Sequence, residues 1–278
     1  MRRTSHTGFD PGGFSNLDAI RDTYQYVSYL EHTTARLRAL SRARYELLNL
    51  HPGDSVLDLG CGLGEDSREL ALLVAPRGKV VGIDSSATMI AQARKRSRKF
   101  GRALRFVVGD AHDLKFANAS FAACWSERVL QHLSDPGRAI AEMVRVIKPG
   151  GRIVLFEPDY STLVIDSADR ATTRSIVLTL ADSVRSSWIG RALLSLLKAN
   201  GIQEVMVVPT PLVSSSFTDT KELLRLDATA KAAVRRGLIT RNDAKQWFSE
   251  LRQRHAAGCF FGCLLCFTAL GRKPDHRS

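Results

Sequence analysis

The 278-residue sequence is 44% hydrophobic and 24% charged, an ordinary composition for a globular protein with a sizeable core. No apolar run is long enough to span a bilayer, and no apolar segment follows the basic first residues as it would in a secretory signal. The five scattered cysteines suggest neither a disulfide framework nor a metal site. We therefore expect a cytoplasmic protein that binds no metal and no membrane.

Residues 1–16 are rich in glycine and serine, and we expect them to form a mobile N-terminus. Residues 17–50 are expected to form a helical cap, because apolar and aromatic residues recur there at helical spacing. The sequence His51-Pro52-Gly53-Asp54 ends this helical stretch. The remaining residues, 51–278, are expected to form the main domain.

Short apolar runs alternate with helical segments five times from residue 55 onward, which predicts a parallel sheet with right-handed crossover connections. The second half differs: we expect helices over about 168–200, a sixth strand at 203–208, a helical insert at about 213–258 and a last strand at 259–270. We interpret the insert before the last strand as a lid over the substrate. The first five strands are expected at 55–59, 79–84, 104–108, 121–125 and 152–157.

The first strand ends in a glycine-rich turn with the pattern Asp58-x-Gly60-x-Gly62-x-Gly64, and a helix follows. Glycines at such a turn let the backbone approach a bound nucleotide closely. A dinucleotide site requires G-x-G-x-x-G, but residue 65 is glutamate, and an aspartate at the strand end would repel a pyrophosphate. The pattern suits a nucleoside ligand with an ammonium group and no phosphate, as in S-adenosylmethionine.

Four segments have distinctive sequences: VLDLGCGLG, GKVVGIDSSATMIAQAR, RFVVGDAHDLKFANASFAACWSERVLQHL and AIAEMVRVIKPGGRIVLFEP. They resemble class I S-adenosylmethionine-dependent methyltransferases, and more narrowly the methyltransferase domain of the ubiquinone and menaquinone biosynthesis type. The resemblance covers a little over a third of the chain. It implies an α/β fold with a Rossmann-like, seven-stranded, mostly parallel sheet of order 3-2-1-4-5-7-6, whose last strand is antiparallel. It implies S-adenosylmethionine as the cofactor and says little about the substrate.

The resemblance also implies roles for residues at the strand ends. Asp84 would accept hydrogen bonds from the ribose hydroxyls, Asp110 would read the adenine, and Glu127 would lie over the sulfonium. Each of these acids could instead cap a helix or lie on the surface, and Met89 could be ordinary core. The implied cofactor-binding residues are Tyr29, Asp58, Gly60, Gly62, Gly64, Asp84, Ser85, Met89, Asp110, Ala111, Ser126 and Glu127.

Methyl transfer from a sulfonium is an in-line displacement, so positioning supplies much of the rate, and a base is needed only if the nucleophile must lose a proton. His132 follows the fourth strand and is our candidate for a general base or a substrate-orienting residue; packing of a helix is the alternative. Glu157, at the end of the fifth strand, is a second candidate for the catalytic site. The aromatic residues expected to line an apolar substrate pocket are Trp188, Phe217, Trp247 and Phe248.

These features predict methylation, on oxygen, nitrogen or carbon, of a small hydrophobic or aromatic acceptor, as in natural-product tailoring. The alternative is an RNA or protein methyltransferase, because the net charge is +12 and a basic run covers residues 94–102. The fourth strand ends in Ser126-Glu127-Arg128-Val129, however, and lacks the Pro-Pro turn of enzymes that methylate exocyclic amines. A binding protein that has lost catalysis is a third possibility. We do not expect nucleic acid as a partner, and the sequence leaves open whether the protein is a homodimer.

Overall fold

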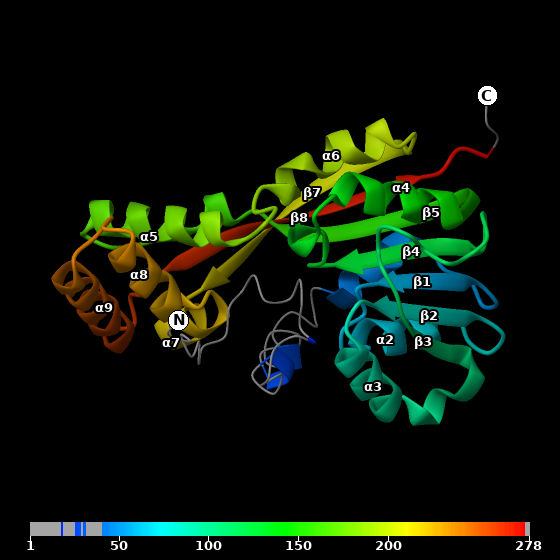
Figure 1. Ribbon diagram of the computed structural model, residues 1–278, viewed down its shortest axis with the longest axis horizontal. Coiled ribbons are helices and arrows are strands. Elements are labelled where there is room, and N and C mark those ends of the chain that lie inside the picture. The colour runs from blue at the N-terminus through cyan, green and yellow to red at the C-terminus, as the bar shows by residue number, and fades with distance from the viewer. Residues whose placement is uncertain (1–17, 19–25, 29, 32–40, 276–278) are drawn as a thin grey trace, which may run out of the picture.

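The computed structural model describes residues 18, 26–28, 30, 31 and 41–275. In these residues, eight strands form one sheet in the order β3-β2-β1-β4-β5-β8, with β6 and β7 both paired to β8 (Figure 1). The first five strands are parallel to one another, and β8 is antiparallel to its neighbours. The strands are β1 (Ser55–Leu59), β2 (Lys79–Asp84), β3 (Leu104–Val108), β4 (Phe121–Glu127), β5 (Ile147–Pro158), β6 (Val164–Ile165), β7 (Gln203–Ser214) and β8 (Gly262–Arg272).

This arrangement confirms the expected Rossmann-like, mostly parallel sheet and its antiparallel last strand. It differs from the expected seven strands by the two-residue strand β6. Since β7 pairs with β8 along its whole length, β5 and β6 share the other edge of β8: β5 pairs with residues 266–272 and β6 with residues 262–263. β8 therefore extends past the end of β5.

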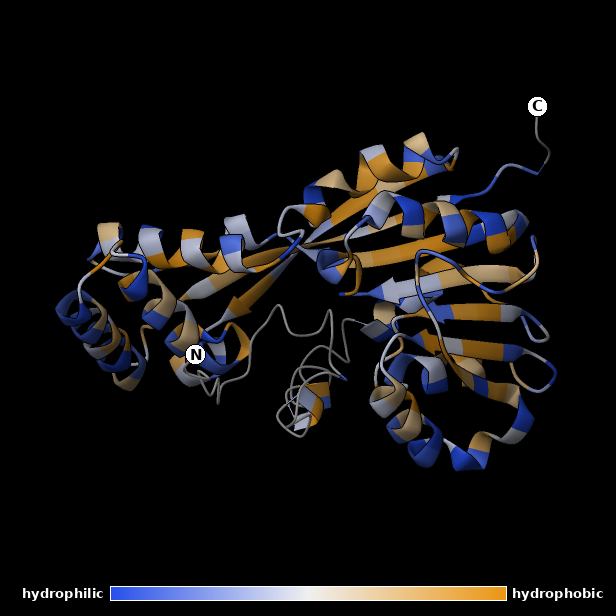
Figure 2. Cartoon of the chain, in the orientation of Figure 1, coloured by the Kyte–Doolittle hydropathy of each residue, from blue (hydrophilic) through white to orange (hydrophobic). Residues whose placement is uncertain are grey.

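Helices cover both faces of the sheet, and the side chains of each strand alternate between two cores. Val56 packs with helices α2 (Glu65–Leu73) and α3 (Ala87–Arg96), whereas the next residue, Leu57, packs with α4 (Pro136–Val146) and α6 (Ile189–Ala199). The alternation follows from the two-residue period of a strand, and it explains why strands buried on both faces read as continuous apolar runs. Figure 2 shows that β1, β2 and β5 are mostly hydrophobic, whereas α9 is largely hydrophilic.

The extended ends of β7 and β8 carry a separate helical unit, which we call the lid. It consists of α5 (Arg170–Ser183), α7 (Phe217–Leu223), α8 (Leu226–Arg235) and α9 (Arg241–Ala256), seen on the left of Figure 1. The lid has its own apolar core, which includes Ile176, Phe217, Trp247 and Phe260. Helices α7 to α9 lie between β7 and β8, as the helical insert in the sequence suggested, and α5 comes from the segment before β7.

Side-chain caps begin two helices of the lid. A capping box formed by Thr240 and Asp243 begins α9. Ser216 caps α7, and its hydroxyl accepts from the Asp219 amide. The strand predicted at 203–208 is β7, which is longer than predicted and ends at Ser214. Short 3₁₀ helices join the main elements: η2 (Glu46–Leu48), η3 (Arg98–Ala103), η4 (Leu130–His132) and η5 (Tyr160–Thr162).

The expectation for residues 1–16 lies outside the described residues, as does most of the 17–50 cap. Within the described residues, no helix has the length and apolar character needed to cross a bilayer. A few residues of the cap are described: Tyr26 packs with Leu63 and Met89, and Tyr45 and Leu48 belong to the core on the α2 side of the sheet. These contacts bring the segment before β1 to the ends of β1 and β2.

Candidate active site

A cavity of about 600 Å³ lies at the carboxyl ends of the parallel strands. This is the edge at which open α/β sheets bind their ligands, where the strand order reverses between β1 and β4. One end of the cavity is lined by the segments that follow β1, β2, β3 and β4. The other end reaches under the lid, where residues of α5, α7, β7 and β8 line it.

The glycine turn after β1 forms part of the cavity wall at Gly60 and Gly62. Both have positive φ angles, 71° and 49°, which side chains other than glycine rarely adopt. The turn is held to β2 because the Gly60 and Cys61 amides both donate to the carbonyl of Ile83, over 2.7 and 3.0 Å. Gly64 does not line the cavity: it precedes α2 and packs against Phe106 of β3.

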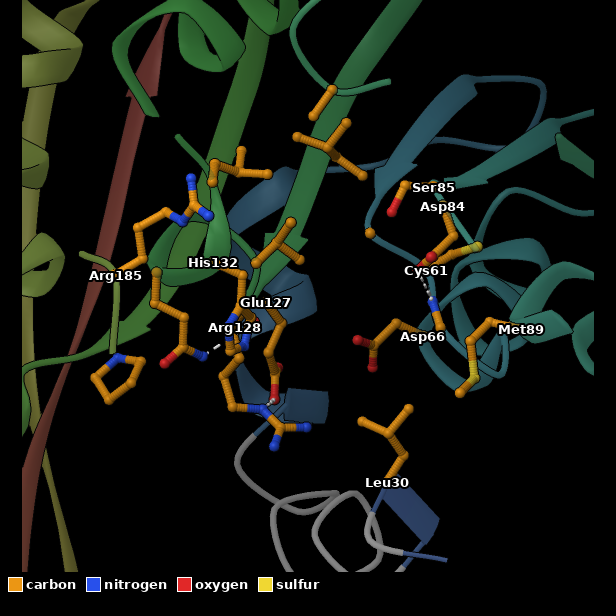
Figure 3. Close-up of a pocket in the computed structure, with 18 of the residues that line it drawn as sticks. Leu30, Cys61, Asp66, Asp84, Ser85, Met89, Glu127, Arg128, His132 and Arg185 are labelled. Atoms are coloured by element: carbon orange, nitrogen blue, oxygen red, sulfur yellow. Dashed lines mark hydrogen bonds and ion pairs between the residues drawn. The ribbon is translucent and has the colours of Figure 1, made fainter. Parts of the chain in front are cut away.

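Asp84 lies at the end of β2 with its carboxylate fixed by two backbone amides. Oδ2 accepts from the Gly62 amide at 2.9 Å, and Oδ1 accepts from the Ser86 amide at 2.9 Å. Burial raises the pKa of Asp84, and these two hydrogen bonds oppose the rise. Ser85 and Met89 line the same wall, and Figure 3 shows Asp84, Ser85 and Met89 together on one side of the cavity. The two bonds hold Asp84 in one orientation and tie it to the glycine turn.

Asp110 and Ala111 follow β3 and line the cavity next to His112. The Asp110 carboxylate accepts from the His112 amide at 2.9 Å and lies 2.7 Å from the His112 Nδ1. The amide bond and the nearby imidazole lower the pKa of Asp110, so this exposed carboxylate is ionised at neutral pH. Sequence reasoning did not single out His112, whose Nε2 is 3.3 Å from the Asp135 amide.

Glu127 ends β4 and lines the cavity, whereas the preceding residue, Ser126, is buried and does not. The Glu127 carboxylate forms a buried ion pair with Arg44, with 2.6 Å between Oε2 and the guanidinium. The same Oε2 accepts from the Ser41 hydroxyl at 2.9 Å. The Arg44 guanidinium also lies 3.6 Å from the centre of the Phe156 ring. The segment before β1 therefore holds Glu127 in place, a contact that no sequence motif indicated.

Asp58 was expected to bind the cofactor, but Asp66 and not Asp58 lines the cavity. Asp58 is only 1% exposed, does not line the cavity and accepts a hydrogen bond from Ser67, and burial raises its pKa well above the usual range. Asp66, which sequence reasoning missed, lines the cavity from the first turn of α2. It accepts from the Tyr45 hydroxyl at 2.6 Å and from the Trp125 Nε1 at 3.2 Å, and burial raises its pKa to about 6. The signal in the sequence that could have indicated Asp66 is its position as the second acidic residue after the glycine turn.

His132 and Glu157, the two candidates for the catalytic site, differ in their access to the cavity. His132 lines it from η4, and burial lowers its pKa to about 4, with a further contribution from Arg128. A histidine with this pKa is neutral at pH 7 and is a weak general base, so the geometry favours the substrate-orienting role. Glu157 does not line the cavity: its Oε1 accepts from the amides of Val129 and Leu130 at 2.8 and 2.7 Å. The structure thus places Glu157 as a support for the turn after β4.

The expected aromatic lining of the substrate end is wrong. Phe217 and Trp247 are buried in the core of the lid, where the Trp247 Nε1 donates to Thr173 at 2.8 Å, and Phe248 packs against both. Trp188 is 60% exposed and stacks with Arg191. The cavity is lined instead by aliphatic residues, namely Leu180, Leu212, Leu223, Leu224 and Leu264. Tyr29, expected to bind the cofactor, lies outside the described residues, but the neighbouring Leu30 lines the cavity.

Comparison with known proteins agrees with this site. A family described as "Methyltransferase domain" matches residues 57–155, which include the end of β1, all of β4 and the segments that line the sheet end of the cavity. The chain belongs to the class I S-adenosylmethionine-dependent methyltransferases. Within that class it is similar to methyltransferases of menaquinone biosynthesis: it is 31% identical over 153 residues to the demethylmenaquinone methyltransferase of Oceanobacillus iheyensis, covering 54% of this chain and 62% of that protein.

Two further similarities extend over most of this methyltransferase. An uncharacterised 37.1 kDa protein of transposon Tn4556 from Streptomyces fradiae is 35% identical over 276 residues, which is 98% of this chain and 77% of that protein. The crystal structure of the [4+2]-cyclase SpnF has a TM-score of 0.52 and 25% identity, over 86% of this chain and 81% of that one. The chain spans less than two thirds of the demethylmenaquinone methyltransferase from Oceanobacillus iheyensis.

The sheet end of the cavity fits the cofactor of this family. S-adenosylmethionine carries positive charge on its amino and sulfonium groups, and five carboxylates line this end: Glu65, Asp66, Asp84, Asp110 and Glu127. At Gly60 a Cβ atom would lie 2.2 Å from the nearest atom of Val129, so the turn has room for a bare backbone only. The protein is accordingly an S-adenosylmethionine-dependent enzyme, and its cofactor supplies an activated methyl group.

Proposed function

We propose that this enzyme transfers the methyl group to a small hydrophobic molecule bound between the cofactor and the lid. The observation that carries the proposal is that a single cavity runs from the carboxylate-lined end to five leucines, of which Leu180 lies on α5, Leu212 on β7 and Leu264 on β8. Small-molecule sites are concave, mostly apolar and have a few polar groups that fix orientation, and this end of the cavity has that composition.

The residues between the two ends supply orientation. Gln131 and His132 line the cavity from η4, and Glu157 fixes the start of η4 through the Val129 and Leu130 amides. Because His132 is neutral at pH 7, it can hydrogen-bond the acceptor without adding a charge to the site. Holding the acceptor in line with the methyl group is the main way in which these side chains would accelerate the reaction.

The alternative acceptor, RNA, receives less support. The basic run forms a hollow of about 490 Å³ lined by Arg94, Arg98, Arg102 and Arg105, which lie on α3, η3 and β3. The hollow shares no lining residue with the cavity. Because no residue lines both the hollow and the cavity, binding of RNA phosphates in the hollow would not by itself place a base at the reacting methyl group. We therefore propose that the positive charge of this face has no role in the reaction.

The test is methyl transfer from S-adenosylmethionine to a panel of phenols, hydroxy acids, amines and polyketide-like molecules, followed by mass spectrometry, with transfer RNA as a further acceptor. We expect transfer to at least one small molecule and a loss of about tenfold or more in rate for Leu212→Asn, which places a polar group in the apolar wall. Leu178→Asn is the matched control, because Leu178 is 52% exposed and does not line the cavity. Transfer to RNA alone would refute the proposal.

A further inference from the structure

The charged residues of the cavity are divided between its two ends. All five carboxylates that line it lie between residues 65 and 127, at the end that fits the cofactor. The lining residues after Glu127 include three arginines, Arg128, Arg185 and Arg225, and no acid. S-adenosylmethionine carries one net positive charge, so it complements the sign of the charge at the acidic end. The basic end faces the acceptor, and an uncharged acceptor would provide no counter-ion for Arg185.

Arg185 is the arginine placed to meet an acceptor. Its side chain forms no hydrogen bond or ion pair with any residue in the part of the chain that the structure describes. Arg128, by contrast, lies 3.6 Å from Glu127 and makes a further contact, and Arg225 also has a partner. Figure 3 shows Arg185 across the cavity from Asp84, Ser85 and Met89, with Glu127, Arg128 and His132 between them in this view.

The position of Arg185 is fixed by the loop that joins α5 to α6. The amide of the next residue, Ser186, donates to the Gln131 carbonyl at 3.0 Å, and the Ser187 carbonyl accepts from the Tyr160 amide at 3.1 Å. Gln131 and Tyr160 both line the cavity. The loop is therefore tied to the cavity wall on both sides, so the exposed side chain of Arg185 reaches the cavity from a fixed backbone.

Gln131 supplies a second polar group at this place. It is 3% exposed and lines the cavity, and its Nε2 donates to the Arg128 carbonyl at 3.0 Å. A carbonyl can only accept, so this bond fixes which end of the amide is oxygen. The Oε1 atom is buried and has no partner among the described residues. A buried acceptor without a donor is unfavourable, and a ligand with a hydroxyl or N–H group would remove this cost.

We propose that the methyl acceptor is an amphipathic carboxylic acid: its carboxylate pairs with Arg185, its apolar body lies along the leucines, and a hydroxyl or N–H group donates to the Gln131 Oε1. This inference rests on the proposed function and specifies its substrate class. A guanidinium matches a carboxylate in shape, through two parallel N–H···O bonds, and in charge. A phosphate ester would bring close to two negative charges to the single unpaired arginine, so a carboxylate is the better complement.

The test is calorimetric titration of the full-length protein saturated with S-adenosylhomocysteine. The probes are 3-(4-hydroxyphenyl)propanoate and 12-hydroxydodecanoate, each beside its methyl ester, and 4-hydroxyphenethyl phosphate. In the wild type we expect at least one acid to bind about tenfold or more tightly than its ester, the ratio typical of a charge-assisted hydrogen-bonded pair. Arg185→Met should reduce the ratio to within about twofold, and Gln131→Met should weaken acid and ester alike.

The controls separate this inference from the proposed function. S-adenosylhomocysteine is titrated first, and its affinity should be the same in Arg185→Met as in the wild type, which also shows that the variant is folded. Arg170→Met removes an exposed arginine of α5 that does not line the cavity, and it should leave the acid-to-ester ratio unchanged. If the cofactor binds normally, three outcomes overturn the carboxylate assignment alone. These are the absence of any preference for the acid, a preference that survives Arg185→Met, and tighter binding of the phosphate. Failure of S-adenosylhomocysteine to bind overturns both.

Discussion

Glu157 provides a test of how the site is built, because its carboxyl is fully buried and forms no ion pair with any of the described residues. Burial raises its pKa from 4.5 to about 8, although two backbone amides donate to its Oε1. Its Oε2 has no partner among the described residues. The folded protein therefore holds this carboxyl protonated at pH 7, whereas the unfolded chain ionises it.

The consequence for stability has a definite sign. Because the folded-state pKa is raised, the folded state binds a proton that the unfolded state lacks between pH 4.5 and about pH 8. The stabilising contribution is complete below pH 4.5 and is lost as the pH rises through 8. Each pKa unit corresponds to about 1.4 kcal/mol, so the loss between pH 5 and pH 8 is about 3 kcal/mol.

Glu157→Gln removes the titrating group and keeps an oxygen that can accept from the Val129 and Leu130 amides. We expect the free energy of unfolding of the variant, relative to the wild type, to increase by about 3 kcal/mol between pH 5 and pH 8. Urea unfolding at several pH values, followed by tryptophan fluorescence, measures the difference. His132 titrates in the opposite sense, since its lowered pKa costs stability as the pH falls below 6.5, but it is present in both proteins and cancels. Parallel pH profiles of the two proteins would refute the reasoning.

Three further substitutions test other parts of the account. Gly60→Ala should lower the free energy of unfolding by more than about 2 kcal/mol and abolish cofactor binding, since the added Cβ would lie 2.2 Å from Val129. The control Gly53→Ala, at a positive φ but with no atom within 4 Å, should lower it by only about 1 kcal/mol, as measured by urea unfolding. Arg44→Met should cost about 3 kcal/mol and weaken cofactor binding, because Glu127 loses the guanidinium at 2.6 Å and keeps the more distant Arg128 at 3.6 Å. The double variant with Glu127→Gln should recover the stability; a double variant as unstable as the single one would contradict the ion-pair explanation. Thr240→Ala should lower the unfolding free energy by about 1 kcal/mol without changing turnover, as loss of a helix N-cap does.

The sheet and the cofactor end of the site could be predicted largely from the sequence. The strands are continuous apolar runs, and parallel strands bring their carboxyl ends to one edge, so the sequence alone places Asp84, Asp110 and Glu127 near one another. The choice between Asp58 and Asp66 could not be made in this way. Whether a carboxylate at a turn faces the ligand or the core depends on its rotamer and on distant partners such as Tyr45 and Trp125.

The residues that line the cavity under the lid are brought together by contacts between distant segments, and the positions of aromatic residues in the sequence predicted the wrong lining. Large aromatic residues in the insert suggested a pocket, but Trp247 and Phe217 are needed to give the lid a core of its own. A unit that extends past the sheet on β7 and β8 cannot use the main core, so its largest side chains turn inward. The smaller leucines are left to face the cavity, and Arg185 lies in a loop with no motif to mark it.

Binding of S-adenosylhomocysteine tests most directly the claim that the carboxylate-lined end of the cavity holds the cofactor. The measurement compares the wild type, Asp84→Ala and the control Asp113→Ala, whose exposed carboxylate pairs with Lys115 and does not line the cavity. The account predicts that the wild type and the control bind alike and that Asp84→Ala binds at least about tenfold more weakly, because the group fixed by the Gly62 and Ser86 amides is lost. Equal affinity of all three proteins, or no binding by the wild type, would contradict it.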